Sequence, residues 1–221
     1  GAAVTIAFED DAEERLKSAH TIFAGSSDAA GDGRGEPGIG GYLHGYYWRM
    51  ALPPMILALM HITGWETLAA CVNILVAARL AGKRAMLLMQ VDALLTPYVI
   101  SKQKSSSADI QHMIKELIGL EDYDTEIAAR LLIRHLSGDG NVPSDLTSRA
   151  LWAELWRLCV LMRVRPVLVA LQERELQLIE NVLAAAAQRR QIVVDITQLR
   201  ALVQTHVPKE MGGEHACAKH W

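Results

Sequence analysis

Most apolar residues beyond position 41 recur at the three- and four-residue spacing of amphipathic helices. Ile110, Met113 and Leu117 share one such face, and Leu171 and Leu178 share another further along the chain. The expected helices cover 8–23, 42–63 with a kink or break at the proline pair, 65–80, 83–95, 110–120, 125–138, 146–164, 166–190 and a short stretch near 197–206. The spacing therefore predicts a long series of helices.

Strand signals are almost missing from the same pattern. No run alternates apolar and polar residues over a useful length, and no strand–helix–strand rhythm is visible. Residues 191–196, QIVVDI, string β-branched residues together and are the one credible strand. We therefore predict an all-α fold, an irregular bundle of about eight or nine helices.

Glycine and proline divide the chain into four parts. Residues 1–23 are expected to form an N-terminal helix, 24–41 a Gly-rich flexible linker, 42–208 a helical domain and 209–221 a C-terminal tail. The linker prediction depends on seven glycines among 18 residues, which cannot bury enough surface to become ordered. Its GDGRGEPGIGG stretch does not match the motif of a phosphate-binding loop, because no predicted strand precedes it and no Lys-Ser/Thr follows it.

The segment from Tyr46 to Trp65 contains 16 consecutive uncharged residues and the pair Pro53-Pro54. A membrane span, a cofactor pocket and a buried, kinked part of the core are all conceivable. A spanning helix needs about 20 apolar residues, and the prolines and a turn at Gly64 interrupt this one. We expect the segment to be enclosed by neighbouring helices and not by lipid, with the pocket kept open as an alternative.

Composition narrows the classes of function. The chain has 221 residues, 51% of them hydrophobic and 21% charged, with a formal net charge of −3. No overall basic field points to nucleic acid, so we expect no nucleic-acid partner. Three widely spaced cysteines argue against a disulfide framework, and no signal peptide is evident, so we expect a cytoplasmic location.

Several side chains are candidates for chemistry or binding. His215, Cys217 and His220 in the tail are metal-ligand types, but a single cluster does not make the two separated pairs of a structural zinc site. His44 and His61 lie close in sequence to aromatic residues, among them Tyr47 and Trp48. Either histidine could help these aromatic residues to line a small-molecule pocket, or could have only a packing role in the fold.

A second candidate surface combines tryptophan with arginine. Trp152, Trp156 and Arg163 occur within the stretch LWAELWRLCVLMRVRP. This composition suits a nucleic-acid face, a protein-interface hot spot, or tryptophans in the core with arginines at their rim. Because Glu154 is interleaved, the protein interface is favoured over nucleic acid.

The stretch YYWRMALPPMILALM resembles the aromatic–X–Leu–Pro-Pro–aliphatic segment of FhuF-type ferric-siderophore reductases. The matching residues are Tyr47, Trp48, Leu52, Pro53, Pro54, Leu57, Ala58 and Leu59. The resemblance covers about 15 residues and implies a reductase with a two-iron cluster held by C-terminal cysteines. This chain has neither the Cys-Cys nor the Cys-x-x-Cys pair of that family, so no cluster ligand is assigned.

We therefore expect a helical protein-interaction module, such as an adaptor, chaperone or assembly subunit, that binds a protein partner through an apolar surface and could self-associate. No cofactor, metal or catalytic residue is expected. The alternative is an FhuF-like reductase or ligand-binding protein with a pocket beside the aromatic–diproline segment.

Overall fold

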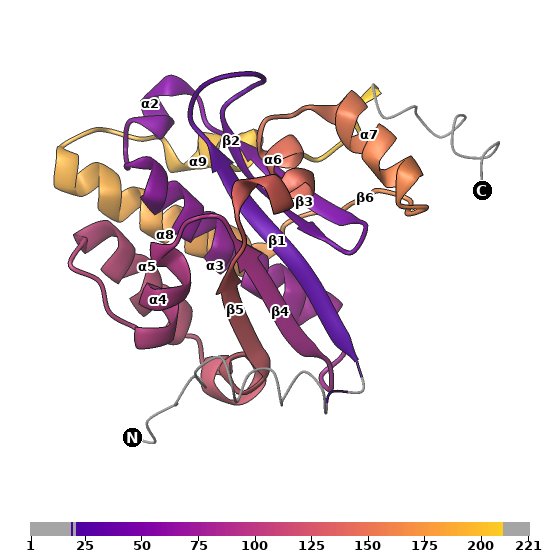
Figure 1. Cartoon of the computed structure of the whole chain (residues 1–221). Coiled ribbons are helices and arrows are strands. Elements are labelled where there is room, and N and C mark those ends of the chain that lie inside the picture. Colours follow the sequence, from indigo (N-terminus) through magenta and orange to yellow (C-terminus); the bar gives the residue numbers. More distant parts are fainter. Residues whose placement is uncertain (1–18, 20, 210–221) are drawn as a thin grey trace.

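A six-stranded mixed sheet, with helices on both faces, forms the centre of the protein (Figure 1). The computed structural model describes residue 19 and residues 21–209. The prediction of an all-α helical bundle is therefore wrong. The predicted N-terminal helix lies almost wholly outside the described residues, and so does all but the first residue of the tail at 209–221.

The strands combine an antiparallel meander with parallel neighbours, in the order β5-β4-β1-β2-β3-β6. The pairs β1–β2 and β2–β3 are antiparallel, whereas β1–β4, β4–β5 and β3–β6 are parallel. Their bounds are β1 Ile22–Ala30, β2 Gly38–Leu43, β3 Tyr46–Ala51, β4 Met86–Val91, β5 Leu131–His135 and β6 Val167–Leu168. The carboxyl ends of β1, β4 and β5 consequently meet at one edge of the sheet.

The glycine-rich stretch 24–41, expected to be a flexible linker, instead supplies most of β1 and the first part of β2. Its glycines are needed for close packing on both faces of β2. A Cβ on Gly40 would lie 2.9 Å from Thr147 of α6, and one on Gly41 would overlap the side chains of Asn73 and Trp48. The glycines therefore let helices approach the strand closely, which composition alone does not reveal.

Helices cover the sheet in two layers. Their bounds are α2 Pro54–Leu57, α3 Ile62–Leu80, α4 Leu95–Lys102, α5 Ala108–Ile118, α6 Val142–Ser148, α7 Trp152–Leu161, α8 Glu173–Arg190 and α9 Ile196–Leu199. Short 3-10 or π turns occupy Tyr123–Ile127, Ala128–Arg130, Gly138–Gly140 and Arg200–Leu202. Helix α3 packs on one face with α5 and α8 behind it, and α6 packs on the other face beside α7 (Figure 1).

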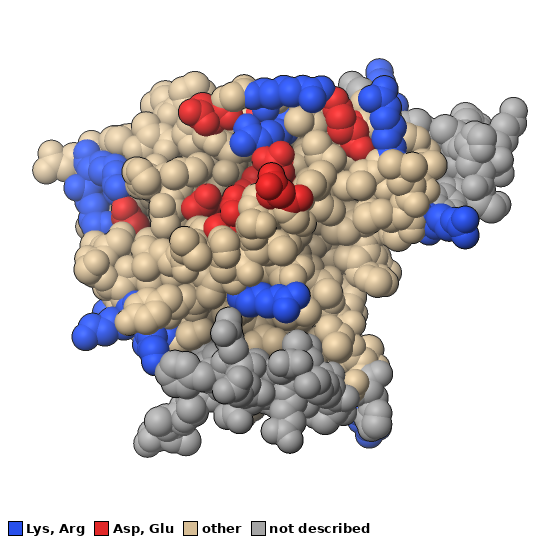
Figure 2. Space-filling model, in the orientation of Figure 1, with Lys and Arg blue, Asp and Glu red and all other residues tan. Residues whose placement is uncertain are grey.

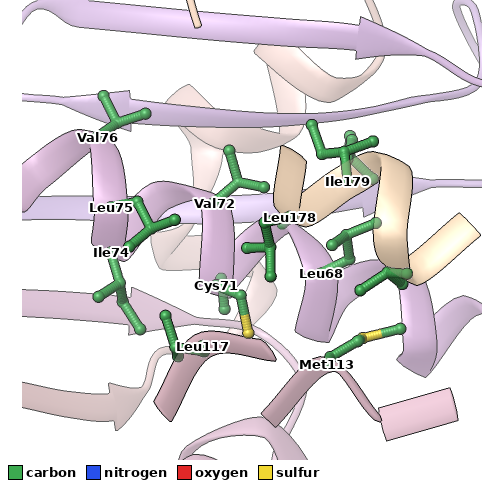
Figure 3. Packing of buried hydrophobic residues seen from close by; sticks show 14 of the residues in the cluster. Leu68, Cys71, Val72, Ile74, Leu75, Val76, Met113, Leu117, Leu178 and Ile179 are labelled. Carbon is green, nitrogen blue, oxygen red and sulfur yellow. The ribbon is translucent and has the colours of Figure 1, made fainter. Parts of the chain in front are cut away.

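Helix α3 is enclosed almost all round, since it lies between the sheet and the helices α5 and α8. Leu68, Val72 and Leu75 are at most 2% exposed. Met113 of α5 and Leu178 of α8 reach its outer side (Figure 3). Its continuous apolar character thus comes from burial on every side. No helix among the described residues is long and apolar enough to cross a bilayer.

Some of the predicted helices are present in the structure, whereas others are replaced by strands. The helices expected at 65–80 and 110–120 correspond to α3 and α5, and the C-terminal part of 166–190 is α8. By contrast, 83–95 contains β4 and 125–138 contains β5, while 191–196 forms no strand. Buried parallel strands are apolar on both faces, so they lack the alternation that would have distinguished them from helices.

Candidate functional site

Four carboxylates from four different elements gather at the carboxyl edge of the sheet. Asp28 lies on β1, Glu66 on α3, Asp92 directly after β4 and Asp145 on α6. We call these four residues the carboxylate cluster. Since Ser27 pairs with Val91, Asp28 and Asp92 are the next residues of two adjacent parallel strands. Adjacent strands are about 4.8 Å apart, so the register itself brings these two residues together.

The four charges are close enough to perturb one another. Burial raises the pKa of Glu66 to about 7, and the charges of Asp28 and Asp92 add to this rise. Burial also raises the pKa of Asp28, whose carboxylate further feels the negative charge of Asp145. The Glu66 carboxylate makes no hydrogen bond or ion pair with any described residue. Glu66 and Asp28 are therefore partly dehydrated acids beside further negative charges, a condition typical of functional sites.

Buried polar side chains attach α6 to β1 and so position Asp145 beside Asp28. The Ser148 hydroxyl donates to Asp28 Oδ2 at 2.7 Å. Asn141 Nδ2 donates to the Ser27 carbonyl at 3.1 Å, and the Ser144 hydroxyl donates to Asn141 Oδ1 at 2.9 Å. The Ser144 hydroxyl also shares a hydrogen bond with that of Ser26. Such a satisfied network fixes the geometry of the groups it connects.

Two basic side chains border the cluster. Arg149 Nε donates to Asp145 Oδ1 at 2.6 Å, while its Nη1 donates to the Asp32 carbonyl in the β1–β2 loop at 2.6 Å. His135, the last residue of β5, places Nε2 3.9 Å from Asp92 Oδ1. Arg149 thus links the β1–β2 loop to Asp145. The His135 imidazole lies at the solvent-exposed rim of the cluster.

Acidic side chains group near the middle of the face drawn in Figure 2, and Lys and Arg side chains are distributed around them. This face carries the carboxyl edge of the central strands, with α6 in front of β1 (Figure 1). In open sheets built from parallel strands, ligands bind outside the carboxyl ends of the strands. The location of the cluster agrees with that rule.

The donor set suits a hard divalent cation. Carboxylate oxygens are the ligands that Mg²⁺ and Mn²⁺ prefer. Among residues 19 and 21–209, no three His, Cys, Asp or Glu side chains are arranged to hold an ion unaided. Mg²⁺ commonly uses only one or two carboxylates and completes its shell with water and substrate phosphate. The cluster fits ions held in that way, shared between protein and substrate.

The residues singled out from the sequence lie away from the carboxylate cluster, and among those that the structure describes Tyr47, Trp152 and Trp156 pack together. Tyr47 and Trp48 on β3 are fully buried, and Trp48 Nε1 donates to Asn73 Oδ1 at 2.9 Å. His44 is exposed in the β2–β3 turn with a φ of 52°. His61 is exposed at the start of α3, where its Nδ1 accepts a hydrogen bond from the Thr63 backbone N–H at 3.4 Å.

The second predicted surface lies on α7 and after it. Trp152 and Trp156 are half-buried against the sheet, and the ring centroids of Trp152 and Tyr47 are 5.6 Å apart. Arg163 is exposed just beyond the helix. The tail candidates His215, Cys217 and His220 lie outside the described residues.

Sequence reasoning did not select any member of the carboxylate cluster. Asp28 was assigned to the linker and Asp145 to a loop, while Asp92 fell inside a predicted helix. One signal was present: Asp92 directly follows the apolar run MLLMQV, as expected for an acid at the end of a buried strand.

No protein-family model matches the chain, and no curated protein matches it either.

Proposed function

We propose that this protein is a divalent-cation-dependent phosphodiesterase that hydrolyses a polynucleotide. The observation that carries the proposal is the convergence of four acids from β1, α3, β4 and α6, with the pKa of Glu66 raised to about 7. Burial makes the ionised forms of Glu66 and Asp28 costly, and bound cations would relieve that cost. Paired metal ions held by carboxylates are a recurring arrangement in nucleases and phosphatases.

Asp28, Glu66, Asp92 and Asp145 would hold the cations. When bound, such ions polarise a phosphodiester and lower the pKa of water so that it can act as the nucleophile. The residues of the chain prepare this site. Ser148 orients the carboxylate of Asp28 by donating to Oδ2.

Protonation of the cluster should respond to the cation. Because burial raises the pKa of Glu66 to about 7, a proton on this carboxylate would be released when a cation binds, since metal ligands must be deprotonated. His135 Nε2 lies at the rim of the site, 3.9 Å from Asp92 Oδ1.

A polymer is favoured as substrate because Lys and Arg side chains surround the acidic group on the face drawn in Figure 2. A long strand could cross that face and touch the surrounding Lys and Arg residues. This departs from the expectation, drawn from the net charge, that no nucleic acid is bound. A net charge of −3 argues only against an overall basic field.

The interaction module expected from the sequence stays a prediction, as does the FhuF-like alternative. Exposed apolar side chains that could serve a protein partner or self-association occur at the end of α7, at Val160, Leu161 and Met162. We also keep a cytoplasmic location as a proposal, supported by the free buried thiols of Cys71 and Cys159, which suit a reducing compartment.

The test is cleavage of end-labelled oligonucleotides: single-stranded DNA and RNA, both duplexes and the RNA–DNA hybrid. We expect cleavage of at least one of these with Mg²⁺ or Mn²⁺, and none with EDTA. Asp28→Asn and Asp92→Asn should each lower the rate by at least about 100-fold. The matched control is Asp124→Asn, at an exposed acid remote from the cluster, which should cleave like wild type.

Two results would contradict the proposal. One is an absence of cleavage by the folded wild-type protein with either ion on every oligonucleotide. The other is full activity in Asp28→Asn or Asp92→Asn.

A further inference from the structure

Helix α4 begins three residues after Asp92 and carries an unusual exposed surface. Leu94 is 75% exposed and Tyr98 59% exposed, although both are large and apolar or aromatic. Beside them lies a pocket of about 430 Å³. We call it the α4 pocket; its lining includes Leu95, Tyr98, Lys102, Lys104, Ser105 and Ser106.

The wall of the pocket formed by residues 103–106 is held in a defined shape. Gln103 ends α4 in the left-handed conformation, and the Lys104 N–H donates back to the Val99 carbonyl at 3.3 Å. From α5, Gln111 Oε1 accepts a hydrogen bond from the Ser105 N–H at 2.8 Å. Lys104 and the serines are therefore kept on the same side as the Tyr98 ring.

We propose that the α4 pocket binds the substrate strand of the proposed nuclease a few nucleotides away from the bond that is cut. This inference rests on the proposed function. An exposed aromatic ring offers a stacking surface for a base or sugar, and lysines with serine hydroxyls suit phosphate oxygens. A peptide partner would contact the apolar side chains, but the combination of the Tyr98 ring with neighbouring lysines suits a nucleic-acid strand better.

The place of the pocket in the chain supports the same occupant. Its lining begins at Leu95, three residues after Asp92, and continues past the end of α4 to Ser106. A strand with its scissile phosphate at Asp92 and following α4 would therefore pass along the pocket.

The test compares pocket variants with matched controls in two assays. The first is fluorescence anisotropy of fluorescein-labelled 20-nucleotide strands and duplexes in Ca²⁺. The second is single-turnover cleavage in Mg²⁺ or Mn²⁺ at saturating protein. The pocket variants are Tyr98→Ala and Lys104→Ala. The controls are Tyr46→Ala on β3, where the tyrosine is 38% exposed, and Lys83→Ala before β4, where the side chain is 82% exposed.

We expect Tyr98→Ala to raise Kd about 10-fold or more, the size of a lost stacking contact. Lys104→Ala should lower the slope of log K against log salt by about one. The single-turnover rate at saturation should stay within about twofold of wild type, and both controls should bind like wild type.

The two proposals fail in different ways. If wild type neither binds nor cleaves any oligonucleotide, the proposed function is wrong and this inference falls with it. If wild type binds and cleaves but the pocket variants match Tyr46→Ala and Lys83→Ala, only the α4 pocket assignment is overturned, and its exposed surface would then suit a protein partner.

Discussion

Glu66 offers a direct way to observe the cost of an ionised carboxylate inside the carboxylate cluster. Burial and the charges of Asp28 and Asp92 raise its pKa from an ordinary 4.5 to about 7. Ionising Glu66 is therefore harder in the folded protein than in the unfolded chain. We predict that Glu66→Gln removes a pH-dependent loss of stability that the wild-type protein shows.

The sign and size follow from linkage. Between about pH 4.5 and 7 the folded state binds more protons at Glu66 than the unfolded state, so the free energy of unfolding falls as pH rises through this window. A rise of the pKa to about 7 corresponds to about 3 kcal/mol. Solvent screening of this partly exposed group lowers the expected contribution to about 1–2 kcal/mol.

Urea unfolding, followed by tryptophan fluorescence at pH 5 and pH 8 in EDTA, measures this contribution. Wild type should lose about 1–2 kcal/mol more than Glu66→Gln between the two pH values. Glu121→Gln, which changes an exposed glutamate, serves as the control and should behave like wild type. Equal pH dependence in wild type and Glu66→Gln would refute the claim that burial and neighbouring charges raise the pKa of Glu66.

Three further changes test the packing and hydrogen bonding that build the site. Leu75→Ala, at a side chain 2% exposed in α3, should lower the free energy of unfolding by about 2–5 kcal/mol in denaturant titration. Gly41→Ala places a methyl group against the Asn73 and Trp48 side chains and should cost about 1–3 kcal/mol in the same assay. Ser148→Ala removes the hydrogen bond that lowers the pKa of Asp28, so the acidic limb of the cleavage pH profile should move to higher pH. An unchanged profile for Ser148→Ala, or an unfolding free energy like that of wild type for Leu75→Ala or Gly41→Ala, would contradict these assignments.

The spacing of apolar residues predicted a helix correctly where the apolar face of that helix is the face that packs on its neighbours. Helix α5 packs one face on α3 and α8, so Ile110, Met113 and Leu117 recur at helical spacing as expected. Helix α3 was also predicted, because a largely apolar stretch without proline precedes the helix-ending signal at Ala81 and Gly82.

The strands were missed for two different physical reasons. Strand β1, IFAGSSDAA, consists of small residues after Ile22 and Phe23, because α3 and α6 pack on either side of it, so most of it lacks the β-branched residues typical of strands. Strand β4, MLLMQV, consists largely of leucine and methionine, which favour helices in isolation. In both strands tertiary packing overrides local propensity.

The carboxylate cluster could not be predicted without the sheet. Its members are separated by up to 117 positions in the chain, and only the parallel pairing of β1 with β4 places Asp28 beside Asp92. Asp145 joins them through the hydrogen bonds that attach α6 to β1, which involve serine and asparagine and give no recognisable signal in the sequence.

Direct binding of Mn²⁺ tests the central claim most simply, by the loss of the electron paramagnetic resonance signal of the free ion. The account predicts that wild type binds Mn²⁺ at pH 8, that Asp28→Asn and Asp92→Asn weaken binding at least about 10-fold, and that Asp124→Asn does not. A folded wild-type protein that leaves the free-ion signal unchanged, or variants that bind as tightly as wild type, would contradict it.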